Sequence, residues 1–172
     1  MYVLGIDPGL SRCGYGLLRA TARGPQLVAL GVLRTHPAAE TPERLAELQQ
    51  DLRALIAEHR PEVVALERVF FQVNVRTAIP VAQAAGLAMA EAVAAGAAVV
   101  EYTPNQVKQA VAGTGGASKD QMERMVQTLL GIAQPIRPVD AADAVGVALC
   151  HLAHAPMQRR VAAASPRAVA VR

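Results

Sequence analysis

The order of short apolar segments and longer helical segments limits the fold more than any other feature of this chain. Three short apolar segments come first, and two more follow, each preceded by a segment whose apolar residues have helical spacing. The expected strands are residues 2–6, 14–19, 27–33, 63–66 and 97–100, with Gly24-Pro25 as the turn between the second and the third. This order predicts a mixed α/β domain: a five-stranded sheet with helices on both faces.

Five helices are expected, three of which carry signals at their N-termini. The first has Thr41 as its cap and Pro42 at its first helical position. Two short helices begin with capping boxes, in which a Ser or Thr side chain and a Gln three residues later satisfy each other's backbone amides. The remaining signals and ranges are an Ala-rich helix at about 77–95, the boxes Thr103 with Gln106 and Ser118 with Gln121, and a last helix at about 139–155.

One domain, residues 1–156, is expected, followed by a disordered basic tail, 157–172. The isoelectric point of about 9.2 suggests an acidic partner, but the tail holds four of the 17 Lys and Arg residues and no Asp or Glu. The remainder has 13 basic and 14 acidic residues. Affinity for nucleic acid must therefore come from a local basic patch, from the tail, or from cations bound by clustered carboxylates.

Membrane and secretory functions are disfavoured. The apolar stretch 78–100 contains Glu91, and an acidic residue at the centre of a bilayer helix costs roughly 2.5–3.5 kcal/mol. Asp7 interrupts the first apolar segment, so no signal peptide is expected. Cys13 and Cys150 have no metal-binding or redox spacing and are expected to be buried thiols of a cytoplasmic protein.

Four acidic residues stand at unusual positions. Asp7 and Glu67 each follow an apolar strand, at the edge where α/β sheets form sites, and Asp140 and Asp143 share one face of the last helix. Each alone is explained by a turn or a helix N-terminus. Together, uncompensated carboxylates would repel one another at a cost of several kcal/mol, roughly. Hard divalent cations such as Mg²⁺ remove that repulsion, and a pair of ions about 3.5–4 Å apart suits phosphodiester hydrolysis.

Lysine occurs only at Lys108 and Lys119, against 15 arginines. This usage suggests that both sites need a compact ammonium rather than a planar guanidinium, although two ordinary surface lysines are the alternative. Lys119 follows the Ser118 cap, where a cation opposes the helix dipole unless a phosphate is held there.

Three other features are given no catalytic role. The loop at 113–119 lacks the spacing of a phosphate-binding loop. His151 and His154 share a helix face with Asp143, but His151 lies roughly 12 Å further along the helix, too far to bind the same ion. A stripe of small residues on the Ala-rich helix is either core packing or a dimer seam: Ala78, Ala82, Gly86 and Ala90.

Four motifs in order along residues 3–150 resemble those of the RuvC family of Holliday-junction resolvases. They are Gly5-Ile6-Asp7-Pro8-Gly9 with Gly14-Tyr15-Gly16, Glu67-Arg68-Val69-Phe70 followed by Asn74, Gln106-Val107-Lys108-Gln109, and Asp140-Ala141-Ala142-Asp143-Ala144. The resemblance implies an RNase H-like fold and a homodimer with two active sites. It also implies symmetric cutting of two strands at a four-way DNA junction in recombination and repair, leaving 5′-phosphate and 3′-hydroxyl ends, with a branch-migration motor as a further partner.

The resemblance also implies roles for individual residues. The catalytic, metal-binding carboxylates would be Asp7, Glu67, Asp140 and Asp143, with two Mg²⁺ ions per site and Mn²⁺ as a substitute. Lys119 would stabilise transition-state charge and, with Lys108, contact phosphate. Phe70, rather than its neighbour Phe71, would stack on an unpaired base, and Arg76 would contact the DNA backbone. The chain departs from the family pattern at Ala82 and Ala85, where Gly and Arg are expected. A contact made by that Arg is therefore left open.

Two other functions fit part of the pattern. An actin-like or sugar-kinase-like ATPase also begins with a strand, an Asp and a Gly-containing turn, but it needs two domains, and 172 residues are too few. A non-catalytic junction-binding protein would gain from losing negative charge near phosphates, whereas this carboxylate set is intact. The fold alone does not choose among RNA hybrids, flaps and junctions as substrates; only the motifs favour junctions.

Overall fold

The computed structural model describes residues 1–68 and 75–164, and the side chains of residues 1–68 and 78–155. The expected order of strands and helices is confirmed. The elements are β1 (Tyr2–Asp7), β2 (Arg12–Thr21), β3 (Gly24–Arg34), α1 (Thr41–His59), β4 (Val63–Glu67), α2 (Val75–Ala94), β5 (Ala98–Tyr102), α3 (Pro104–Ala112), α4 (Lys119–Leu130) and α5 (Val139–Ala164).

The five strands form one mixed sheet in the order β3-β2-β1-β4-β5. β2 pairs antiparallel with β1 and β3, whereas β4 pairs parallel with β1 and β5. In the β1–β4 pair, Ile6 lies opposite Leu66, so these two strands end side by side. The central position of β1 thus brings Asp7 next to the strand that carries Glu67.

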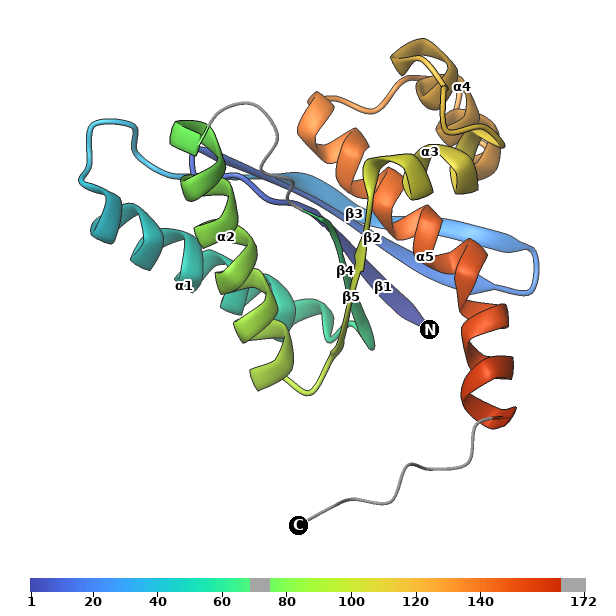
Figure 1. Cartoon of the computed structure of the whole chain (residues 1–172), viewed down its shortest axis with the longest axis horizontal. Helices are drawn as coiled ribbons and strands as arrows, with labels where there is room; N and C mark the ends of the chain where they lie inside the picture. The colour runs from blue at the N-terminus through green and yellow to red at the C-terminus, as the bar shows by residue number, and fades with distance from the viewer. Residues whose placement is uncertain (69–74, 165–172) are drawn as a thin grey trace.

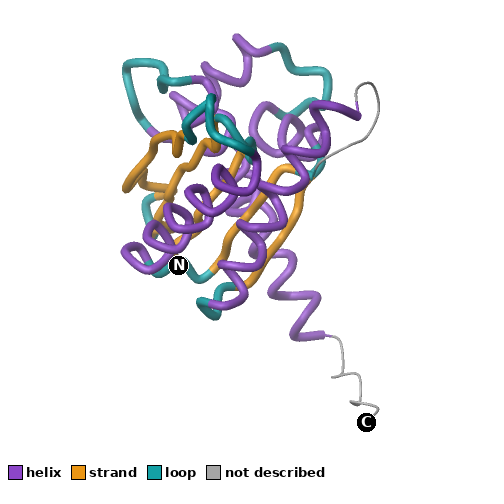
Figure 2. The backbone as a smooth tube through the Cα atoms, turned by 90° about the vertical axis from the view of Figure 1, so that its left-hand side faces the viewer, coloured by secondary structure: helices purple, strands orange, loops and turns teal. Residues whose placement is uncertain are grey.

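Helices cover both faces of the sheet, as expected (Figures 1 and 2). On one face, α1 and α2 pack a core that includes Leu48, Leu52 and Ala88. On the other face, α5 lies along the sheet, with α3 and α4 beside it, around a second core that includes Val107 and Val145. Alternate residues of the strands point into these two cores, since successive strand residues face opposite sides.

Helix α5 rests directly on the backbone of β1 and β2. A Cβ atom on Gly5 would overlap the backbone oxygen of Ala144, and one on Gly14 would overlap that of Asp140. A Cβ atom on Gly16 would overlap the side chain of Val145. The glycines therefore set the close approach of helix and sheet, and Gly14 does so at the end where the acidic residues lie.

The boundaries differ from expectation in two places. The turn between β2 and β3 lies at residues 22–23, so Gly24 and Pro25 belong to β3, where they pair with Thr21 and Ala20. Proline is tolerated there because β3 is an edge strand of the sheet. An edge strand has a second strand on one side only, so a residue without an N–H disturbs the sheet less. Helix α5 continues past residue 155 to Ala164, because Ala and Arg favour helix even where no apolar stripe remains. The division of the chain at residue 156 stays a prediction.

The helix starts are partly as expected. The capping boxes of α3 and α4 are both present. At α1 the prediction that Thr41 is the cap is wrong: Glu40 is the N-cap residue, and its side chain makes no cap hydrogen bond. Because Pro42 has no N–H, this end of the helix has one donor fewer to satisfy.

The Ala-rich helix α2 buries a different face from the expected stripe. Its core residues are Ala84, Ala85, Ala88 and Ala92. In contrast, Gly86 and Ala90 are exposed, so core packing does not explain the stripe, and the dimer seam stays a hypothesis. None of the described helices combines the length and apolar character needed to cross a membrane. Cys13 and Cys150 are buried free thiols, and burial raises the pKa of each to about 12.

Candidate active site

The four acidic residues meet at one end of the sheet. Asp7 is the last residue of β1 and lies opposite Gly14 of β2. Glu67 is the last residue of the neighbouring parallel strand β4. Asp140 and Asp143 stand in the first turns of α5, which Gly14 admits against the sheet at the backbone of Asp140. Backbone contacts thus bring carboxylates from three elements together.

The ionisation of Asp7 shows how close the four carboxylates are. Burial and, in decreasing order, the negative charges of Asp143, Glu67 and Asp140 together raise the pKa of Asp7 to about 7. A carboxyl with this pKa gives up its proton only near neutrality. The site therefore carries more negative charge than the protein compensates by itself.

Each lysine partly offsets the negative charge of one of these carboxylates. Burial and then Asp143 raise the pKa of Glu67, and Lys108 lowers it. Burial raises the pKa of Asp143, whereas the nearby Lys119 lowers it and Asp140 raises it again. The two lysines of the chain thus both lie at this site, one on α3 and the other at the first residue of α4.

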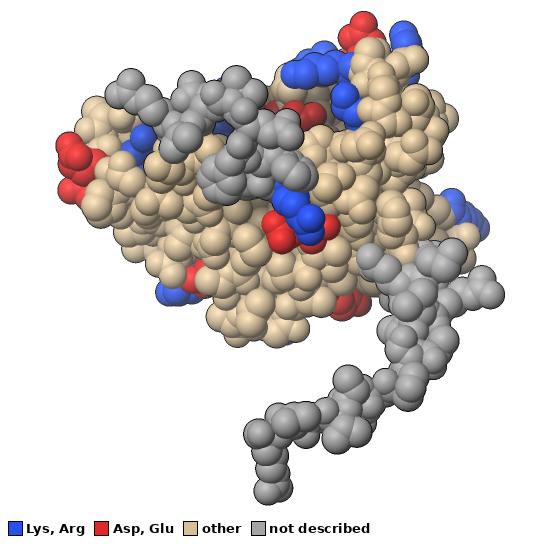
Figure 3. Space-filling model, viewed as in Figure 1, with Lys and Arg blue, Asp and Glu red and all other residues tan. Residues whose placement is uncertain are grey.

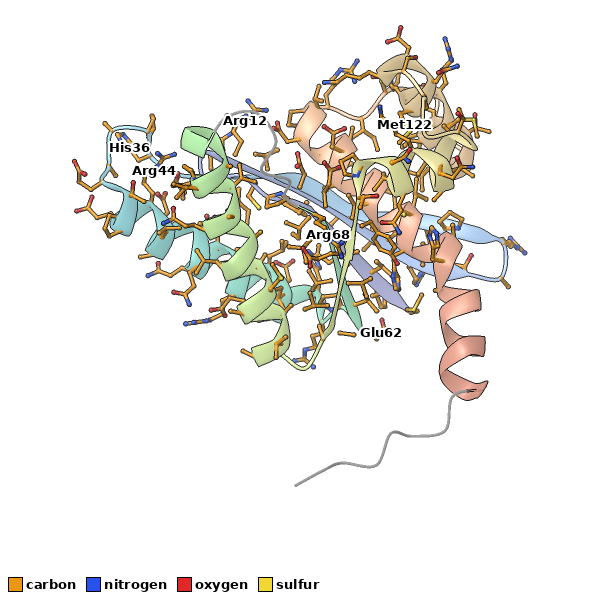
Figure 4. All side chains as sticks on the ribbon, viewed as in Figure 1. Arg12, His36, Arg44, Glu62, Arg68 and Met122 are labelled. Carbon is orange, nitrogen blue, oxygen red and sulfur yellow. The ribbon has the colours of Figure 1, made fainter. Side chains whose placement is uncertain are left out.

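Asp140 is held differently from the other three. Burial alone would raise its pKa, but hydrogen bonding to Arg12 and the charges of Arg12 and Arg34 lower it overall. The guanidinium of Arg12 donates from Nε to Oδ2 of Asp140 at 2.9 Å, and Nη2 bonds to the same oxygen. Figure 4 shows Arg12 at the end of the sheet that faces the N-terminal turn of α5. Asp140 is therefore ionised without any added cation.

Sequence reasoning missed Arg12 and Arg34. The two residues are cross-strand partners at the end of the β2–β3 pair, where like charges destabilise a sheet unless an acidic group lies nearby. The pairing of two arginines would have indicated a nearby acidic group, but it can be inferred only when the register of β2 and β3 is known.

The loop that carries Arg12 is tied to the rest of the domain by hydrogen bonds. The buried hydroxyl of Thr35 donates to the carbonyl oxygen of Leu10 at 2.7 Å. Arg44 of α1 donates to Thr35 at 2.9 Å and to the hydroxyl of Ser11 at 2.6 Å (Figure 4). These bonds fix the segment between β1 and β2, and with it the direction from which Arg12 reaches Asp140.

The chemistry of this cluster suits a hard divalent cation. Its donors are carboxylate oxygens, which Mg²⁺ and Mn²⁺ prefer, and their mutual repulsion is relieved when a cation binds. Within the described residues, no three acidic, His or Cys side chains are close enough together to hold an ion as they stand. One reason is that Asp140 is paired with Arg12. Its carboxylate would have to turn toward the other three to share an ion with them.

The two histidines of α5 belong to another cluster. The Tyr102 hydroxyl and Nδ1 of the buried His151 lie 2.9 Å apart. His154 donates from Nδ1 to the carbonyl oxygen of Cys150 at 2.8 Å. These contacts give the polar groups of both histidines structural partners.

A cavity of about 300 Å³ opens beside the carboxylates, between α3, α4 and the start of α5. Its polar end is formed by Glu67, Asp143, Lys108 and Lys119, and the rest of the lining is apolar except for Glu123 and Arg137. Met122, labelled in Figure 4, forms part of the wall on α4. Figure 3 shows a hollow in this part of the surface, with acidic side chains at its base and basic side chains around it.

Two residues expected to contact DNA are Phe70 and Arg76. Phe70 and its neighbour Phe71 lie outside the described residues, as does the side chain of Arg76. The contacts of Phe70 and Arg76 with DNA stay predictions.

Comparisons with known proteins agree with the geometry. The family described as "Crossover junction endodeoxyribonuclease RuvC" matches residues 3–151. Two proteins of that name are similar along most of their length. The one from Salinispora arenicola is 51% identical over 169 residues, covering 98% of this chain and 97% of the relative. The one from Syntrophomonas wolfei is 49% identical over 152 residues, covering 88% of each.

Solved structures are also similar. Thermus thermophilus RuvC superimposes with a TM-score of 0.86 at 35% identity, covering 92% of this chain and 97% of the other. The same protein in complex with a Holliday junction substrate gives a TM-score of 0.86 at 36% identity, covering 92% and 96%. The yeast mitochondrial Holliday junction resolvase shares only the fold, with a TM-score of 0.70 at 15% identity over 92% of this chain and 80% of the other. The RNase H-like fold expected from the motifs is confirmed.

Proposed function

Because this chain belongs to the RuvC family of crossover junction endodeoxyribonucleases, we propose that it resolves four-way DNA junctions in recombination and repair. It would do so by cutting two symmetric strands and leaving 5′-phosphate and 3′-hydroxyl ends. The observation that carries the proposal is the gathering of Asp7, Glu67 and Asp143 around the ends of β1 and β4, with Asp140 held beside them by Arg12. A nuclease needs this excess of carboxylate, whereas a protein that only binds DNA is hindered by it.

Asp7, Glu67, Asp140 and Asp143 would hold the metal. We expect two Mg²⁺ ions, with Mn²⁺ as a substitute, because the donors are oxygens and the site lacks compensating charge. When bound, such ions supply activation of water and stabilisation of the leaving oxygen in phosphodiester hydrolysis. Arg12 bonds only to Oδ2 of Asp140, and its positive charge opposes a metal ion there. A shift of Asp140 toward the metal would free that guanidinium for a phosphate of the DNA.

The two lysines would position the strand that is cut. Lys108 and Lys119 stand at the polar end of the cavity, each close enough to a carboxylate to lower its pKa. A strand lying over the carboxylates would place its phosphates between the two ammonium groups. Lys119 then offsets negative charge that develops at the reacting phosphate, which is the catalytic role we assign to it.

The remaining contacts follow the family resemblance. Phe70 would stack on an unpaired base and Arg76 would contact the backbone of the DNA. A homodimer would place two equivalent sites on two equivalent strands, which a twofold junction requires. We also propose a cytoplasmic location and cooperation with a branch-migration motor.

The test is a comparison of substrates with and without metal. Purified protein is incubated with a synthetic mobile four-way junction and with a matched linear duplex, with and without Mg²⁺. Paired, symmetric nicks that a ligase reseals, in the junction alone and only with metal, are the expected result. Binding without cutting in both Mg²⁺ and Mn²⁺ would favour the non-catalytic alternative, and similar cutting of the duplex would overturn the junction assignment.

A matched pair of variants tests the role of the carboxylates. Asp7→Asn should abolish cutting while junction binding stays equal or becomes stronger, because a negative charge near the phosphates is lost. Asp51→Asn makes the same change on α1, which packs on the face of the sheet opposite α5. This variant should cut like the wild type. Equal cutting by the wild type and Asp7→Asn would show that the metal mechanism is wrong. Binding of a labelled ATP analogue would revive the ATPase alternative.

A further inference from the structure

Gly146 is the only glycine within α5, and packing does not require it. The glycines of β1 and β2 leave no room for a Cβ atom, because α5 lies against them. At Gly146, an added Cβ would lie 3.6 Å from Cγ1 of Val107 and 3.9 Å from Cε of Met122, which are ordinary van der Waals distances. Glycine also favours a helix interior less than alanine does. What Gly146 does provide is space, because it lies in the wall of the cavity beside the carboxylates.

The cavity has two chemically different ends. Its apolar lining comes from α3, α4, α5 and the segment before α5, and includes Val107, Met122, Val126, Ile136, Val139 and Ala142. Its other end holds Glu67 and Asp143 together with both lysines. At about 300 Å³ it lies at the lower end of the roughly 300–1,000 Å³ typical of small-molecule sites. A ligand that fits both ends has a compact, largely apolar body joined directly to an anionic group.

We propose that the cavity receives one nucleoside unit of the strand that is cut, turned out of its stack so that the adjoining phosphate reaches the carboxylates. This inference rests on the proposed function, since it places the scissile phosphate at the polar end. The faces of the base lie against the apolar walls, and Lys108 and Lys119 hold the phosphate. Gly146 and the apolar wall residues thereby become specificity-determining residues for the nucleotide beside the cut.

Two charged residues of the cavity lining can bind the edge of a base. Glu123 of α4 and Arg137, both in the lining, form an ion pair with 2.8 Å between Nη1 and Oε2. Both side chains are well exposed, at 57% for Arg137 and 38% for Glu123, so each retains hydrogen-bonding capacity toward an incoming base. Turning out a base costs least where it is already unpaired or poorly stacked, as at the centre of a branched substrate. The cavity therefore links preference for branched DNA to the position of the cut.

The test combines variants of the cavity with substrates that lack one base. Gly146→Leu fills the cavity, Gly146→Ala narrows it, and Ala153→Leu adds the same side chain at an exposed position of α5 as a control. Four-way junctions carry a single abasic nucleotide at each position flanking the scissile phosphate. The wild type should cut one of these junctions roughly tenfold more slowly than the intact junction, the scale of a lost base contact.

Gly146→Leu should cut the intact junction as slowly as the wild type cuts that abasic junction, and the two changes should not add. Gly146→Ala should lose less of the cutting rate than Gly146→Leu. Because alanine stabilises helices, the unfolding temperature of Gly146→Ala should not fall. This variant keeps the test valid even if Gly146→Leu folds poorly. Additive losses, or a Gly146→Leu variant that cuts like Ala153→Leu, would overturn the nucleoside site.

A second readout does not depend on cutting. 2-Aminopurine is placed at the sensitive position and the junction is bound without metal. Fluorescence should rise with the wild type, because the base leaves its stack, and should not rise with Gly146→Leu. An equal rise in both would overturn the proposal. A wild type that cuts no junction would defeat the proposed function itself, whereas normal cutting unaffected by the cavity variants would defeat only this inference.

Discussion

Arg12 donates two hydrogen bonds to one carboxylate oxygen of Asp140, joining the start of β2 to the first turn of α5. The pair is partly exposed, with 42% of the Arg12 side chain and 26% of the Asp140 side chain accessible to solvent. It leaves Asp140 as the acidic residue of the site whose pKa falls, while that of Asp7 rises to about 7. The protein thus supplies its own cation to one of the four carboxylates, and a metal ion must compete with it.

Replacing Arg12 tests this competition. Arg12→Ala should bind Mn²⁺ more tightly, by roughly two- to fivefold, because a partly exposed ion pair is worth at most about 1 kcal/mol. Its junction affinity should fall, since a guanidinium that pairs with phosphate is gone. Isothermal titration calorimetry with Mn²⁺ and a junction-binding assay measure the two effects. Arg19→Ala, which removes another arginine of β2, should change neither, and weaker metal binding by Arg12→Ala would contradict the competition.

The raised pKa of Asp7 predicts how metal-free stability depends on pH. The folded protein holds this proton more tightly than the unfolded chain, so ionisation penalises folding. Stability should therefore fall as pH rises from about 4 to about 7, by at most on the order of 4 kcal/mol at 1.36 kcal/mol per pKa unit. Mg²⁺ added at pH 8 should restore much of the loss.

Thermal unfolding of the wild type and Asp7→Asn across this pH range checks the prediction. The difference between the two proteins isolates Asp7 from the other titrating groups. The variant should be the more stable protein at pH 8 without metal, and the two should converge near pH 4. Curves that run parallel from pH 4 to pH 8 would contradict the assignment.

Adding one methyl group at Gly14 should move Asp140 and Asp143 of α5 away from Asp7 and Glu67 of the sheet. The new Cβ would overlap the backbone oxygen of Asp140, so α5 must shift, and overpacking of this kind costs roughly 1–3 kcal/mol or more. Gly14→Ala should lower the free energy of unfolding and weaken Mn²⁺ binding together. Gly86→Ala makes the same change at a helical position where nothing lies within 4 Å, and should be at least as stable as the wild type. A Gly14→Ala variant with unchanged metal binding would show that this contact does not set the site.

The two lysines should differ in their effects from the surface arginines. Lys108→Ala and Lys119→Ala should each lower the slope of log K against log salt for junction binding by about one phosphate contact. Lys119→Arg should restore binding better than cutting, because a planar fork replaces a compact ammonium beside Asp143. Arg23→Ala, in the exposed turn between β2 and β3, serves as the control. Full cutting by Lys119→Ala would remove that residue from the catalytic set.

Sequence reasoning placed the fold and the carboxylates because both follow from local patterns. Asp7 and Glu67 stand directly after apolar strands, and Asp140 and Asp143 share one face of a helix, so each position can be read from its neighbours in the chain. The role of Arg12 could not be read in this way. Its partner, Asp140, lies 128 residues further along the chain, and the contact depends on how closely α5 approaches the sheet.

The end of α5 and the turn at residues 22–23 were also misjudged, for a related reason. Periodic apolar residues indicate helices that bury one face, whereas α5 beyond residue 155 continues because of its intrinsic helix propensity. Gly24-Pro25 looks like a turn in isolation, and only its place on an edge strand makes it compatible with β3. In both cases the missing information lay in the surroundings of the segment and not in the segment itself.

The contact of α5 with the glycines of β1 and β2 affects how the site tolerates amino-acid substitutions in the core. Across most interfaces in a domain, the distance between two elements depends on the sizes of the side chains between them, and it drifts as those side chains are exchanged. Here backbone meets backbone at Gly5 and Gly14, so the spacing is fixed by the radii of main-chain atoms, which no substitution elsewhere alters. Substitutions in the surrounding aliphatic core should therefore leave the distance from Asp7 to the acidic turn of α5 nearly unchanged.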